Sequence, residues 1–112
     1  MFCNLLYWNI GRKFYQIRNT CSNPIDYLSK YCSYSFGSDF FHRENIRYMK
    51  RFYSYFPIYC KSFEKISWNH FKVILNIDSS KKRNFYLYLY LFLRCSTDEL
   101  EQLIRMKSYE RI

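Results

Sequence analysis

Residues 41–56 carry the clearest periodic pattern in the chain, and this pattern constrains the fold more than any other segment. Apolar side chains recur there at three- and four-residue steps, which is the spacing of one face of an α-helix. The apolar set is Ile46, Met49, Phe52, Tyr53 and Phe56. Pro57 ends the pattern, because proline cannot continue a helix. The segment therefore predicts a helix over residues 42–56 with one buried face.

Shorter signals predict five further helices around this one. Gly37 is typical of a helix end, and Ser38 or Asp39 is expected to cap the helix that follows. Ser96 and Glu99 form the pattern of a capping box. The five predicted helices cover residues 3–18, 24–36, 67–76, 80–94 and 97–108. With 2 Gly, 2 Pro and no linker, the chain is expected to form a single, mainly α-helical domain over residues 1–112.

The segment Phe85–Leu93 does not fit the helical pattern as cleanly. Leucine and tyrosine alternate along it, which is the period of a strand with two different faces. Tyr and Phe favour a strand, whereas Leu favours a helix. The residues alone leave helix and strand equally open here.

A second stripe on residues 42–56 is basic. Arg43, Arg47, Lys50 and Arg51 recur at helical spacing away from the apolar face. The chain carries 18 Lys and Arg against 9 Asp and Glu, a formal net charge of +9, which favours polyanionic partners. Such cations can contact phosphates, and Arg can read guanine in the major groove. The four residues are the main candidates for nucleic-acid binding; the competing interpretation is a solvated helix face, whose field Glu44 would lower.

Two smaller basic clusters are further candidates. Lys81 and Lys82, followed by Arg83, could form a wing-like or backbone contact or a plain loop. Arg12 and Lys13 are a third possibility on the first predicted helix. Aromatic and small residues such as Trp8 and Gly11 are interpreted as scaffold, and so are Trp68 and Tyr86.

No catalytic, metal or cofactor site is expected. The acids lack the Asp and Glu-x-Lys spacing that metal-dependent DNA cleavage requires. His70 stands between Trp68 and Phe71 and is predicted to be a hydrogen-bonded structural histidine, and His42 to lie at a helix start. The five cysteines include no C-x-x-C pair and are interpreted as reduced thiols that serve as small apolar residues.

Membrane association and export are not expected either. The longest apolar run, Phe85–Leu93, is less than half of the roughly 20 residues that a spanning helix needs. Residues 1–8 lack a basic start and a small-residue cleavage site. A cytoplasmic protein is predicted.

Several ordered motifs resemble the N-terminal domain of the YhcG family. They are Trp8–Arg12, Asn45–Met49 followed by Phe56-Pro57, Ile66–His70, Arg83–Tyr86 and Tyr109–Ile112. The chain departs from the family pattern at Phe40–His42, where a Gly-Phe-Ser motif is usual, and at Cys95, where Trp is usual. The resemblance covers nearly the whole chain.

The resemblance implies a helical domain of winged-helix or helix-turn-helix type that binds DNA in preference to RNA. It also favours a helix for Phe85–Leu93. Family members carry a PDDEXK nuclease-like half after this domain, and that half is expected to be absent here. Two alternatives remain open: a module that docks onto a separately encoded PDDEXK nuclease, and a truncated remnant of a split nuclease gene.

Overall fold

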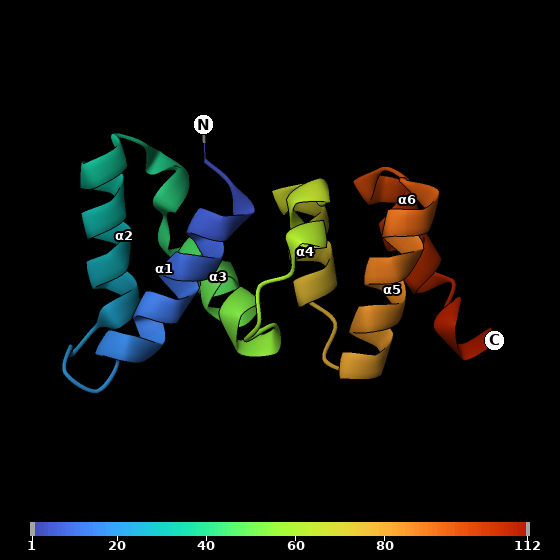
Figure 1. Ribbon diagram of the computed structural model, residues 1–112, viewed down its shortest axis with the longest axis horizontal. Coiled ribbons are helices and arrows are strands. Elements are labelled where there is room, and N and C mark those ends of the chain that lie inside the picture. The colour runs from blue at the N-terminus through green and yellow to red at the C-terminus, as the bar shows by residue number, and fades with distance from the viewer. Residues whose placement is uncertain (1, 112) are drawn as a thin grey trace. The chain divides into compact units, whose positions relative to one another are not determined.

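A computed structural model describes residues 2–111 and shows six α-helices (Figure 1). No strand occurs in that range, so the mainly helical class is confirmed and the strands of a wing are not seen there. The α-helices are α1 Asn4–Ile17, α2 Pro24–Phe36, α3 Arg43–Tyr55, α4 Trp68–Leu75, α5 Ser80–Leu93 and α6 Thr97–Arg105. Short 3-10 helices are η1 Asp39–Phe41, η2 Lys61–Lys65 and η3 Tyr109–Arg111.

Contacts divide the chain into two units, which are described separately. The N-terminal unit is Met1–Cys60 and holds α1 to α3. The C-terminal unit is Lys61–Ile112 and holds α4 to α6.

The N-terminal unit is built on a close crossing of α1 and α3. A Cβ added to Gly11 would lie 2.0 Å from the carbonyl oxygen of Met49 and 3.0 Å from the Cβ of Tyr53, so any side chain larger than hydrogen would collide with the α3 backbone. The predicted apolar face of α3 lies against this crossing, and Ile46, Met49 and Phe52 are fully buried. Gly11 was interpreted as scaffold from the sequence, and in the structure it allows the two helices to approach closely.

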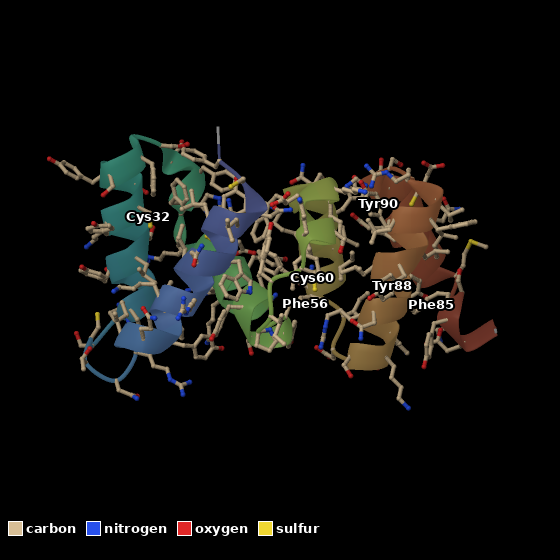
Figure 2. All side chains as sticks on the ribbon, in the orientation of Figure 1. Cys32, Phe56, Cys60, Phe85, Tyr88 and Tyr90 are labelled. Atoms are coloured by element: carbon tan, nitrogen blue, oxygen red, sulfur yellow. The ribbon has the colours of Figure 1, made fainter. Side chains whose placement is uncertain are left out.

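Helix α2 is held to the unit by caps and side-chain contacts. Asn23 accepts a hydrogen bond from the Asp26 backbone N–H at its start, and Gly37 ends it with a left-handed φ of 62°. The Ser29 hydroxyl donates to the Phe41 carbonyl at 2.7 Å. Cys32 is buried on this helix (Figure 2).

The start of α3 differs from the expectation. Ser38 caps η1, where its hydroxyl accepts from the Phe40 N–H, and neither Ser38 nor Asp39 caps α3. The cap is His42, whose Nδ1 accepts a hydrogen bond from the Asn45 N–H at 3.4 Å. The reason is that a turn of 3-10 helix intervenes between Gly37 and α3, so Ser38 ends up one turn too early. His42 does lie at a helix start, as predicted.

In the C-terminal unit, Phe85–Leu93 is helical throughout. Tyr86, Leu87 and Tyr90 are buried at helical spacing, whereas Tyr88 and Phe92 are 67% and 83% exposed. Figure 2 shows Phe85, Tyr88 and Tyr90 along α5. The sequence alternation therefore does not correspond to alternating burial, and the helix favoured by the family resemblance is confirmed.

Side chains bonded to loop carbonyls hold the C-terminal unit together. The Arg83 guanidinium, 5% exposed, donates to the carbonyls of Ile77 at 2.6 Å and Asp78 at 3.1 Å. Arg94 donates to the Lys65 carbonyl at 3.0 Å. The predicted capping box starts α6, with the Glu99 carboxylate accepting from the Ser96 N–H at 2.9 Å.

Candidate nucleic-acid interface

The main candidates all lie on α3, away from its buried face. Arg43 and Arg47 are exposed, and Lys50 and Arg51 are partly exposed. The amphipathic pattern places them there, because its apolar positions are taken up by the contact with α1. The outward face of α3 is therefore strongly basic, and exposed Glu44 is the acidic residue of its first turn.

Arg43 is engaged within the protein. Its Nε lies 2.8 Å and its Nη2 2.7 Å from one carboxylate oxygen of Asp26 on α2. The Lys30 ammonium lies 3.3 Å from the other oxygen. Hydrogen bonds from Lys30 and Arg43 lower the pKa of Asp26, so the carboxylate stays charged. Arg43 therefore links α3 to α2 and is less available to a phosphate than its exposure suggests.

The remaining α3 cations differ in the contacts that their side chains make within the protein. The Lys50 ammonium lies 4.7 Å from the centre of the Phe14 ring, and the Arg51 guanidinium 5.0 Å from that of Tyr48. Aromatic rings attract cations in this range, and the contacts restrict where the charged groups lie. Arg47 is exposed and forms no ion pair or hydrogen bond within the described part of the chain. Arg47 is the α3 cation most available to a ligand.

The three residues of the second predicted cluster, Lys81, Lys82 and Arg83, lie in three different environments on α5. Lys81 is exposed. Lys82 forms an ion pair with Glu110, and its pKa is raised chiefly by the hydrogen bond to that carboxylate. Arg83 is buried, so placing it in a basic surface cluster was wrong. Its guanidinium donates hydrogen bonds to two loop carbonyls.

The third cluster lies on α1. Arg12 and Lys13 are both exposed. Lys13 lines a cavity of about 390 Å³ between α1 and α2, together with Tyr27 and Tyr31.

His70 is hydrogen-bonded within the protein. The Nε2 of His70 lies 2.8 Å from the Cys95 carbonyl oxygen, its Nδ1 is bonded to the Ser67 hydroxyl, and its ring lies 4.1 Å from that of Tyr90. The predicted structural role of His70 is confirmed. No three His, Cys, Asp or Glu side chains within the described range are grouped as metal ligands.

The cysteines match the expectation only in part. Cys32 is buried, and burial raises the pKa of its thiol. Cys3 and Cys60 are exposed, so describing all five as small apolar residues was wrong.

None of the helices described is both long and apolar enough to cross a bilayer.

The structure thus defines an all-helical domain, within its described residues, that carries a basic helix face on its N-terminal unit. The model of the DUF1016 N-terminal domain matches residues 3–111, and the chain belongs to that family. This is the YhcG-like N-terminal family, so the resemblance is confirmed. Neither the curated proteins nor the solved structures contain a match to the chain.

Sequence reasoning missed one surface feature, a row of exposed tyrosines on α2. Tyr27, Tyr31 and Tyr34 follow one another at four- and three-residue steps. That spacing within the predicted helix 24–36 was the available signal. It marks a side-chain row on one helix face but does not tell whether the row is buried.

Proposed function

We propose that the chain is a non-catalytic, cytoplasmic nucleic-acid-binding domain that contacts phosphates through the basic face of α3. The observation that carries the proposal is the exposure of Arg47 on that face, one turn before two cations whose charged groups lie over aromatic rings. Cations held in place before binding lose less side-chain entropy on contact with a phosphate. Helices α2 and α3, joined by residues 37–42, which include η1, are interpreted as a helix-turn-helix-like pair with α3 as the reading helix.

DNA rather than RNA is the expected ligand in this proposal, and Lys81 and Lys82 supply a secondary contact. Because Lys82 is paired with Glu110, Lys81 is the stronger candidate for a phosphate contact. The family resemblance supports DNA over RNA and supports a functional link to PDDEXK nuclease-like proteins.

Fluorescence anisotropy of a labelled duplex, measured over a series of salt concentrations, tests the α3 face. Glutamine at Arg47 and Lys50 (R47Q/K50Q) removes two charges while keeping good helix formers at both positions. Each phosphate contact contributes about −0.9 to the slope of log K against log salt, so this variant should bind more weakly with a slope flatter by about 2 units.

The matched control is K61Q/K65Q, which removes two exposed charges from η2. It should leave the slope nearly unchanged. Equal losses in both double variants would show a general charge effect and contradict the assignment of α3. A wild-type protein with no affinity at low salt for either duplex or single-stranded DNA would overturn the proposed function.

A second candidate function is protein docking, and an apolar patch of the C-terminal unit favours it. Tyr88, Phe92 and Leu93 of α5 are exposed. Leu93 also lines a cavity of about 530 Å³ with Leu103 and Met106. Phe92→Ser should abolish association with a separately encoded PDDEXK nuclease-like protein, measured by co-purification at high salt, if this face is used. Unchanged association would remove the patch as the docking site.

A further inference from the structure

Tyr27, Tyr31 and Tyr34 form an aromatic row along the outer side of α2, hereafter the tyrosine row. They are 50%, 58% and 90% exposed. The rings of Tyr27 and Tyr31 lie 6.0 Å apart and within 20° of parallel. Apolar residues scattered singly over a surface are normal, but α2 has 13 residues and carries three large exposed rings on one stripe. Such a contiguous group indicates a binding surface.

Cations border the tyrosine row on both sides. On the α1 side, Lys13 and the two rings of Tyr27 and Tyr31 line the same cavity, whose floor includes Ile10 and Leu28. On the other side lies Lys30, one position before Tyr31 on the helix. The acid next to the row is Asp26, and both of its oxygens are already bonded to cations. The surface around the rings is therefore positive.

The tyrosine row is continuous with the basic face of α3. Asp26 immediately precedes Tyr27 and binds Arg43, which is the first residue of α3. A ligand lying across this junction meets aromatic rings on α2 and cations on α3. Both elements belong to the N-terminal unit, so the ligand can contact both within one unit.

Aromatic rings beside cations match the chemistry of unpaired nucleotides. Every base has a face that can stack on a tyrosine ring, and a phosphate follows each base along the strand. In a duplex the base faces are covered by their neighbours, so rings on a protein surface reach them only in single strands, loops or ends. A purely protein partner would not require cations on both sides of the row.

We infer that the tyrosine row stacks against bases of a single-stranded nucleic acid whose phosphates contact Lys13, Lys30 and the basic face of α3. This inference rests on the proposed function, because the α3 face supplies part of the phosphate binding. It adds a preference for unpaired over duplex nucleic acid, and a contribution to binding that does not depend on salt.

The test compares two labelled single strands of equal length by fluorescence anisotropy: oligothymidylate and an abasic deoxyribose-phosphate strand. Both carry the same phosphates, but only the first carries bases. Wild-type protein should bind oligothymidylate at least about fivefold more tightly, since one base–aromatic stack contributes that much or more. The ratio of the two affinities should stay constant as salt rises, because stacking releases no counterions.

Variants locate the stacking surface. Leucine at both Tyr27 and Tyr31 (Y27L/Y31L) should bring the affinity for oligothymidylate most of the way down to that for the abasic strand, with Tyr34 as the ring that remains. The conservative variant Y27F/Y31F keeps the rings and should retain the difference. The control Y88L/F92L removes two exposed rings from α5 and should bind as wild type does. Circular dichroism checks that each variant is folded.

The outcomes separate this inference from the proposed function. Equal wild-type affinity for the two strands overturns the inference, leaves the α3 proposal standing and favours a protein partner for the tyrosine row. Absence of binding to either strand and to duplex at low salt overturns both. A loss in Y88L/F92L equal to that in Y27L/Y31L would also overturn the assignment to α2. The comparison of wild-type affinities for the two strands tests the inference even if the leucine variant does not fold.

Discussion

The two units of the chain are stabilised in different ways. The N-terminal unit depends on a backbone crossing at Gly11 and on packed rings, such as Trp8 against Tyr53 at 5.1 Å. The C-terminal unit has an apolar core as well, and in it polar side chains such as Arg83 and His70 bond to backbone carbonyls. The first arrangement cannot accept added volume, and the second cannot lose a donor. Added volume at Gly11 and loss of the donor at Arg83 should therefore both destabilise the protein, each within its own unit.

Each unit contains one of the 2 tryptophans, so their stabilities can be measured separately. Trp8 reports the N-terminal unit in a Trp68→Phe background. Trp68 reports the C-terminal unit in a Trp8→Phe background. Urea unfolding followed by the fluorescence of the remaining tryptophan then assigns each effect below to a unit.

The largest effect is expected from Gly11→Ala. The new Cβ would lie 2.0 Å from the Met49 carbonyl oxygen, so the α1 and α3 backbones must separate. The loss in free energy of unfolding should be about 3 kcal/mol or more, despite the higher helix propensity of alanine. The Trp8 signal should show the loss. Gln16→Ala, at an exposed position of the same helix, is the control, and a Gly11→Ala protein as stable as that control would disprove the close crossing.

A smaller effect is expected from Arg83→Met. Methionine can occupy much of the space of the arginine stem, but the carbonyls of Ile77 and Asp78 lose their charged donor. We expect a loss of about 2 kcal/mol, seen by Trp68. Lys81→Met, an exposed neighbour on the same helix, should change the stability little. Equal effects of the two substitutions would show that the Arg83 contacts contribute nothing beyond a surface charge.

The smallest effect is expected from acid acting on the Asp26 ion pairs. The pKa of Asp26 is lowered in the folded protein by Lys30 and Arg43. The pairs therefore stabilise the fold above the ordinary carboxyl pKa, and this contribution is lost as the pH falls through the lower folded-state value. Between pH 7 and about pH 3, the urea midpoint seen by Trp8 should fall less in Asp26→Asn than in wild type.

The Trp68 signal provides the comparison for this acid effect. Glu99 and Glu110 of the C-terminal unit also have lowered pKa values, through hydrogen bonds to Ser96 and Lys82. Their acid sensitivity should be the same with or without Asp26→Asn. A change in the Trp68 midpoint would mean that the substitution acts beyond its own unit.

Much of the fold could be predicted from the sequence because helix periods and caps are local signals. The helix bounds agree to within a few residues, and the capping box at Ser96 is present. Phe85–Leu93 could not be assigned from its own residues, since Leu and Tyr are both apolar enough to be buried. Their alternation therefore carries no information on which side is covered. Which rings of α5 are buried depends on the other elements of its unit.

The candidate site was predicted less completely, because availability of a charge depends on partners distant in sequence. Arg43 was correctly placed on the basic face, but its bond to Asp26 joins residues 17 positions apart. Arg83 follows two lysines and looks equally exposed, yet its donors reach carbonyls that no sequence pattern marks. The helical period alone was enough to predict the exposure of Arg47, and the structure agrees with that prediction.

The contact at Gly11 also determines which part of the N-terminal unit can move. With the α1 backbone against a carbonyl oxygen of α3, these two helices have no room to slide or rotate past each other. Helix α2 is attached to η1 and α3 through side chains, including Ser29 to the Phe41 carbonyl and Asp26 to Arg43, which can lengthen or exchange. Any hinge within this unit therefore lies at the two ends of α2, and the α1–α3 pair acts as its fixed base.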